Sequence, residues 1–114
     1  MNSSNVPVVV TIGVFDGVHA GHRQVLGIAK SIASSINGTL TAATFDPPPK
    51  AFLRPESFDG LLTLPERRAD LLRANGVDHV ETLKFTDAMA HMSSDEFVEE
   101  ILLGALNAQV IIVG

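Results

Sequence analysis

Residues 8–22 read VVVTIGVFDGVHAGH, and this stretch decides how the chain is expected to fold. Its first five residues are all β-branched, as in a strand that is buried on both faces of a sheet. The next ten contain three glycines and two histidines, and a helix-like pattern follows from Arg23. A glycine-rich turn between a strand and a helix is where α/β proteins bind anions, because backbone N–H groups and the helix dipole point there.

Strands and helices are expected to alternate along the rest of the chain. Apolar residues at helical spacing, Asn-Gly helix stops and two capping-box spacings mark the elements. The expected elements are a helix at 23–36, a strand at 40–45, a helix from Thr63–Glu66 to Asn75–Gly76, a strand within 77–85, a helical turn at 86–92, a helix from Ser93–Glu96 through Leu102, and a strand at 109–113.

A proline-rich loop interrupts this pattern at residues 46–61, with four of the six prolines. A long, stiff loop in a small domain is more often functional than idle. The whole pattern predicts a Rossmann-like α/β fold, a parallel sheet of about four strands with helices on both faces and right-handed crossovers. The glycine-rich turn and the proline loop should then share the carboxyl edge of the sheet, where such folds bind ligands.

Composition excludes several classes of protein. The net charge of −5 disfavours a general nucleic-acid or anionic-membrane binder, and the absence of cysteine removes disulfides and thiolate chemistry. No signal peptide or long apolar stretch is present in the sequence. We therefore expect a cytoplasmic domain without nucleic-acid or membrane partners.

His19 and His22 are the candidate chemical groups of the turn, three residues apart. Beside the positive end of a helix dipole, both imidazoles could donate hydrogen bonds to a phosphate as charge builds in a phosphoryl or nucleotidyl transfer. Gly17 and Gly21 are expected to take positive φ and let the backbone approach a ligand. Three alternatives stay open: a metal pair, for which Asp16 is the nearby third ligand; ordinary polar residues at a helix start; and simple turn-forming glycines.

Gly13-Val-Phe-Asp-Gly-Val-His-Ala-Gly-His22 resembles the His-x-Gly-His signature of the adenylyl/cytidylyltransferase superfamily. Thr44-Phe-Asp-Pro-Pro-Pro49 narrows the resemblance to the FAD synthetase (FMN adenylyltransferase) module of bacterial bifunctional riboflavin kinase/FAD synthetases. Leu62-Thr-Leu-Pro-Glu-Arg67, Ser94-Asp-Glu-Phe-Val98 and Val110-Ile-Ile-Val-Gly114 are similar to segments of that family in the same order, so the resemblance covers about residues 6–114.

The resemblance implies adenylyl transfer from ATP to FMN, giving FAD and pyrophosphate, with Mg²⁺ whose ligands it leaves unassigned. Its implied site residues are His19 and His22 for catalysis; Gly13, Val14, Phe15, Asp16, Gly17 and Gly21 for the nucleotide; and Phe45, Asp46, Pro47 and Pro48 for the flavin side.

Two features depart from the family pattern. Pro48 stands where the family usually has a histidine, and the sequence ends at Gly114, before the family's later flavin and ATP loops. We therefore expect residues 1–114 to form a C-terminally truncated transferase domain that lacks the riboflavin kinase domain, folds marginally or self-associates, and has little activity alone. The alternatives are another transferase of the superfamily, of the pantetheine-phosphate or nicotinate-nucleotide type, and a non-catalytic nucleotide-binding fragment.

The remaining basic residues are weaker candidates. Lys50 and Arg54 flank the proline loop and could attract an anionic substrate. Arg67 and Arg68 are expected to form a solvated helix face.

Overall fold

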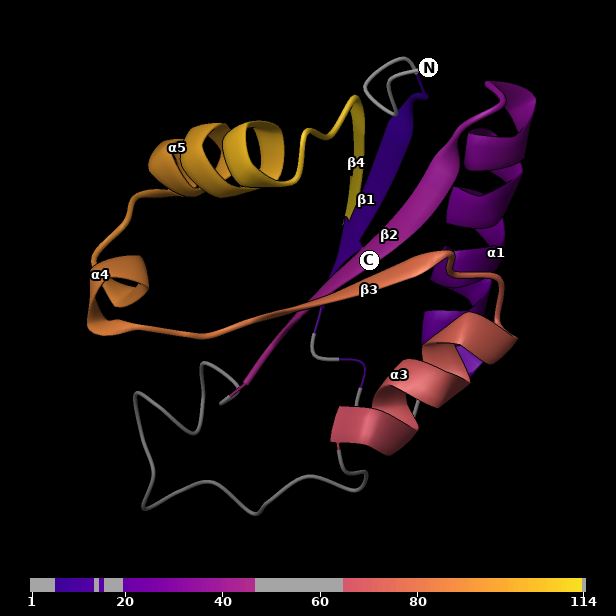
Figure 1. The fold of residues 1–114 in the computed structure, drawn as a ribbon, viewed down its shortest axis with the longest axis horizontal. Coiled ribbons are helices and arrows are strands. Elements are labelled where there is room, and N and C mark those ends of the chain that lie inside the picture. The colour runs from indigo at the N-terminus through magenta and orange to yellow at the C-terminus, as the bar shows by residue number, and fades with distance from the viewer. Residues whose placement is uncertain (1–5, 14, 16–19, 47–64, 114) are drawn as a thin grey trace.

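A computed structural model describes residues 6–13, 15, 20–46 and 65–113 of the chain (Figure 1). The strands are β1 (Val8–Ile12), β2 (Thr39–Phe45), β3 (His79–Leu83) and β4 (Val110–Val113). The helices are α1 (Ala20–Ser35), α3 (Pro65–Ala74), α4 (Asp87–Ala90) and α5 (Ser94–Phe97), and α5 continues as the π-helical η4 (Val98–Ala105).

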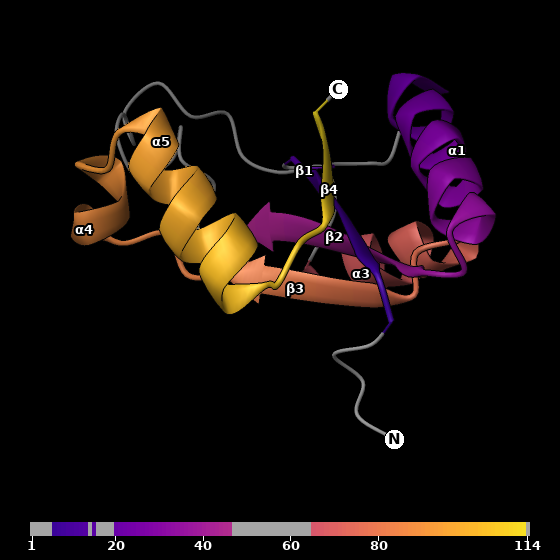
Figure 2. The same cartoon turned by 90° about the horizontal axis from the view of Figure 1, so that it is seen from above.

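The four strands form one parallel sheet in the order β3-β2-β1-β4. Helices α1 and α3 lie on one face, and α5 with η4 lies on the other (Figures 1 and 2). This confirms the predicted Rossmann-like fold. Because β2 and β4 pair with opposite sides of β1, the strand order reverses at β1, and open α/β sheets bind ligands at the carboxyl end of such a switch point.

Two hydrophobic clusters hold the layers together, one on each face of the sheet. Alternate residues of β1 point to opposite faces, so Val9 packs with α1 and α3 while Val10 packs with η4. Both valines are completely buried, as predicted for a strand covered on both sides. The helical contacts of the first cluster include Leu26, Ala29, Ala33 and Leu72, and the main helical contact of the second is Leu102.

Helix α1 starts earlier than predicted, and left-handed residues end both α1 and α3. Helix α1 begins at Ala20, three residues before the predicted start. The prediction missed this first turn because it relied on the spacing of apolar residues, and the first turn has none in the core. It ends where Asn37 takes a left-handed φ of 55° and the Gly38 N–H donates to Ala33 O at 2.8 Å. Gly76, at φ 97°, ends α3 in the same manner.

The predicted capping box at Ser93 is present. The Glu96 N–H donates to Ser93 Oγ at 3.1 Å, and the Ser93 N–H donates to Glu96 Oε1 at 2.8 Å. The pKa of the Glu96 carboxyl is lowered mainly by the hydrogen bond from the Ser93 backbone and, to a smaller extent, by that from the Ser93 side chain. The counterpart predicted at Thr63 and Glu66 lies outside the residues whose side chains are described.

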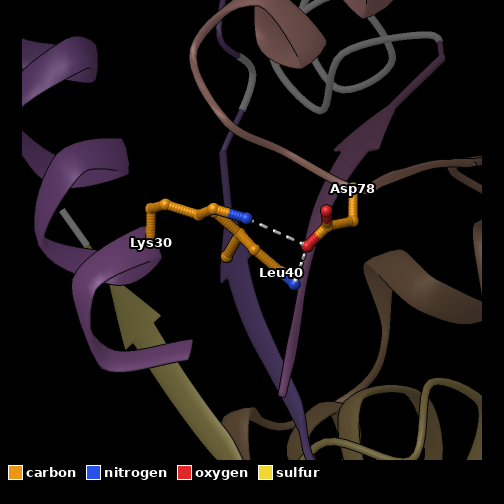
Figure 3. Close-up of polar contacts among 3 residues, drawn as sticks. All are labelled: Lys30, Leu40 and Asp78. Atoms are coloured by element: carbon orange, nitrogen blue, oxygen red, sulfur yellow. Dashed lines mark hydrogen bonds and ion pairs between the residues drawn. The ribbon is translucent and has the colours of Figure 1, made fainter. Parts of the chain in front are cut away.

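Asp78 ties the amino ends of two strands to α1 (Figure 3). Its carboxylate accepts the Leu40 N–H at 2.8 Å and lies 3.5 Å from Lys30 Nζ, while its own N–H donates to Leu40 O at 2.9 Å. The side chains of Lys30 and Asp78 are about two-fifths exposed, so solvent screens their ion pair. The contact to the backbone of buried Leu40 is therefore the more important one.

We expect Asp78→Ala to lower the free energy of unfolding by about 1–2 kcal/mol, because the Leu40 N–H loses its acceptor. Lys30→Met removes only the screened ion pair and should change the free energy of unfolding by less than about 0.5 kcal/mol. Urea denaturation of both variants checks this, and equal losses would show that the ion pair matters as much as the backbone contact.

Arg68 overturns the expectation of a solvated arginine pair. Arg67 is exposed, but Arg68 is 1% exposed, and its guanidinium has no hydrogen-bond partner among the described residues. The cause is helix geometry: Arg68 is one turn before Leu72, which belongs to the first hydrophobic cluster, so both lie on the inward face of α3. The spacing of four residues between Arg68 and the apolar Leu72 was the sequence signal that could have predicted the burial of Arg68.

Burying a charge without a partner is costly, so we expect Arg68→Met to raise the free energy of unfolding by roughly 1–4 kcal/mol. Arg67→Met is the matched control on the exposed face and should stay within about 0.5 kcal/mol of the wild type. Thermal unfolding followed by circular dichroism checks both, and a large loss of stability in Arg68→Met would contradict the interpretation.

Candidate functional site

The carboxyl edge of the sheet brings the two predicted segments together as far as they are described. After β1 ends at Ile12, the Gly13 N–H donates to Ala43 O of β2 at 3.0 Å. After β2 ends at Phe45, the Asp46 N–H donates to Leu83 O of β3 at 2.9 Å. Parallel pairing thus carries both chain exits to the same edge.

Phe15 holds the turn after β1 in an unusual conformation. Its φ is 56°, which is rare for a bulky residue, and its side chain is 3% exposed. The ring meets the His22 imidazole edge-on, with centroids 5.3 Å apart and planes at 69°. A Cβ on Gly13 would lie 3.2 Å from the Phe15 ring, so glycine permits this close packing. The backbone is strained here, as is common where packing holds a functional turn.

A cavity of about 350 Å³ lies beside this turn, on the α1 face of the sheet. His22 and Gly21 line it from the first turn of α1, where the helix dipole is positive. An imidazole and a helix amino end together favour an anion or a group that gains negative charge. The described lining residues are Thr11, Ile12, Gly13, Phe15, Gly21, His22 and Val25.

One detail of the predicted turn is wrong. Gly21 lies within α1, and Gly76 is the glycine with positive φ in the described part of the chain. Among the described residues of the motif, Phe15 takes the left-handed conformation instead. The predicted site residues that fall outside the described residues are Val14, Asp16, Gly17, His19, Pro47 and Pro48.

A second cavity, of about 370 Å³, opens on the opposite face of the sheet at the same edge. Phe45 stands in it, with its ring 5.8 Å from that of Phe85 and 6.1 Å from that of Phe97. Met89 and Met92 add flexible, polarisable side chains. Such a lining suits a flat, apolar ring system. Asp46, predicted beside it, is exposed directly after β2.

Sequence reasoning missed much of this second cavity. Phe45 was predicted on the flavin side, whereas Phe85, Met89, Met92 and Phe97 were not assigned to a site. Phe85 comes just after β3 as Phe45 ends β2, so the parallel topology was the signal that could have placed both at one edge.

Ile12, at the end of β1, lines both cavities. A third cavity, of about 410 Å³, lies near the amino ends of the strands and is lined by none of the predicted site residues. Within the described residues, no group of three or more His, Asp or Glu side chains is placed to hold a metal ion. No helix in the described part is long and apolar enough to cross a membrane.

Comparison with known proteins agrees with this architecture. An FAD synthetase from Listeria monocytogenes is 38% identical over 114 residues, covering 99% of this chain and 46% of the relative. A bifunctional riboflavin kinase/FMN adenylyltransferase from Pseudomonas fluorescens is 37% identical over 106 residues, covering 93% of this chain and 34% of the relative. The chain thus spans about a third to a half of the length of these two relatives.

The fold of the chain is also similar to that of a solved structure. A Streptococcus pneumoniae protein described as a macrolide-efflux protein superposes with a TM-score of 0.84 at 29% identity, covering 96% of this chain and 42% of that protein. The family model "FAD synthetase" matches residues 1–114. The chain therefore belongs to the FAD synthetase family.

Proposed function

We propose that the chain contributes to adenylyl transfer from ATP to FMN, giving FAD and pyrophosphate, as part of FAD synthesis in the cytoplasm. The observation that carries this proposal is the pair of cavities on either side of the β1 carboxyl end, one lined by glycine and histidine and the other by aromatic rings. A reaction that joins two large substrates needs two such sites that meet at one edge.

The first cavity is assigned to ATP. A phosphate oxygen of FMN attacks the α-phosphorus, the bond to the bridging oxygen of the β-phosphate breaks, and pyrophosphate leaves with that electron pair. His22, at the positive end of α1, stabilises the charge that develops on the α-phosphate oxygens. We assign the same role to His19 from its place in the motif. The backbone around Gly13 and Gly21 gives the phosphates close access.

The second cavity is assigned to the flavin ring of FMN. Phe45, Phe85 and Phe97 offer aromatic surface at the edge where β2 ends. Pro47 and Pro48 follow Phe45 in the sequence and are proposed to border the same substrate. The FMN phosphate then extends toward Ile12, which lines both cavities.

Mg²⁺ would enter with the ATP phosphates and reduce their negative charge. Mg²⁺ in nucleotide sites commonly keeps several waters and binds substrate phosphates with one or two carboxylates. Asp46 is the exposed carboxylate nearest to the end of β2 in sequence, and Asp16 is the carboxylate within the motif. We assign neither as a ligand.

The name of the Pseudomonas fluorescens relative couples riboflavin kinase with FMN adenylyltransferase activity. We propose that a kinase of that type supplies FMN to this site. The family match disfavours the pantetheine-phosphate and nicotinate-nucleotide alternatives. Binding of both ATP and FMN would distinguish a transferase domain from a fragment that binds a single nucleotide.

We expect His22→Ala to weaken MgATP binding by roughly 10- to 150-fold, because a charged or polarised hydrogen bond to phosphate contributes about 1.5–3 kcal/mol. His79→Ala is the matched control, since His79 is exposed at the start of β3 and lines the third cavity. Isothermal titration calorimetry measures both. Equal MgATP affinity in the wild type and His22→Ala would remove His22 from the site.

Phe45→Leu should weaken FMN binding by roughly 3- to 10-fold, because it removes ring contacts while keeping most of the apolar volume. Quenching of flavin fluorescence measures the affinity, and MgATP affinity should stay unchanged. If the wild type shows no flavin response, or if Phe45→Leu loses ATP rather than FMN, the assignment of the second cavity is wrong.

A further inference from the structure

Thr11 is a polar residue at a completely buried place in the central strand. It is the fourth residue of β1 and is 0% exposed. Alternation along the strand puts it on the same face as Val9, toward α1, and it lines the first cavity with His22. A valine would fill this position equally well as far as strand packing is concerned.

The hydroxyl of Thr11 has no hydrogen-bond partner within the described part of the chain. Buried hydroxyls normally have a partner, and an unsatisfied one destabilises the folded state. A bound ligand can satisfy such a group, because the residue also lines a cavity large enough for a small molecule.

The surroundings indicate which part of a nucleotide reaches Thr11. The described lining of the cavity contains glycine, apolar and aromatic residues and His22, but no lysine or arginine. Thr11 lies two residues before Gly13, so it is deeper along the strand than the turn and the helix amino end. A multiply charged phosphate chain at that depth would lack compensating charge, whereas an uncharged sugar or base would not need it.

We infer that the Thr11 hydroxyl hydrogen-bonds the nucleoside part of ATP and so helps the first cavity to select its ligand. This inference rests on the proposed function, which places ATP in this cavity. Thr11 then binds one end of the ATP while the turn and His22 bind its phosphates. The cost of leaving the hydroxyl unsatisfied in the free protein is recovered when ATP binds.

Thr11→Val tests this with two effects of opposite sign. The near-isosteric valine removes the buried hydroxyl, so the Tm of the free protein should rise by about 4 °C. ATP affinity should fall by roughly 5- to 30-fold, because the nucleoside loses its partner. Affinity for inorganic triphosphate, which has no nucleoside, should stay unchanged. Thr11→Ser should restore ATP binding. Calorimetric titration gives the affinities.

Thr41→Val is the matched control, a buried threonine of β2 that lines the third cavity instead. It should leave ATP affinity unchanged. Unchanged ATP affinity in Thr11→Val, or a parallel loss of triphosphate affinity, would overturn the inference while leaving the proposed function standing. A lower Tm with normal ATP affinity would show that the hydroxyl is structural, which also overturns it. If the wild type binds no ATP, the proposed function fails and the inference with it.

Discussion

Burial of β1 on all four sides is the constraint on which the rest of the structure depends. The strand is paired with β2 and β4 along its edges and is covered by α1 on one face and η4 on the other. Val9 and Val10 each anchor one of the two hydrophobic clusters. Displacing this strand would open both clusters and both sheet ladders together, so the folding of the domain is coupled to the strand that leads into the site.

The geometry of the site follows from where this strand must stop. Pairing with β2 continues for one hydrogen bond past Ile12, at Gly13, and the chain then has to reach the start of α1. It does so through Phe15 at positive φ, with the ring buried against His22. A conformation of this kind persists when its surroundings over-determine it. The packed ring therefore helps to fix the position of His22 at the positive end of α1.

Much of the fold could be predicted from the sequence because its signals are local. The β-branched run at Val8, the Asn37–Gly38 stop and the Ser93–Glu96 box each act through neighbouring residues, and each was confirmed. The parallel sheet and the helices on both of its faces followed from general rules for α/β folds. Arg68 was misplaced because its burial depends on the tertiary contact of α3 with the sheet. Arginine as a residue type is usually exposed, so the sequence predicted exposure for both Arg67 and Arg68, and this was wrong for Arg68.

The site was predictable only where a motif lies on one segment. His22 belongs to the motif after β1, and Phe45 to the motif that ends β2. Phe85 and Met89, in contrast, join the second cavity through pairing of β2 with β3. Thr11 was missed because a threonine in a strand is ordinary by composition, and its significance comes from the cavity that α1 forms over it.

The placement of the cavities on opposite faces restricts where a transfer between them can occur. The sheet separates the two faces along the whole of β1, and the separation ends at the carboxyl edge, where Ile12 lines both cavities. A phosphate from one side and a nucleophile from the other can meet only beyond that residue. This is also where α1 begins and where its dipole is strongest. In the proposed reaction, the edge at which the two substrates would meet thus also provides the positive potential that a phosphoryl transition state requires.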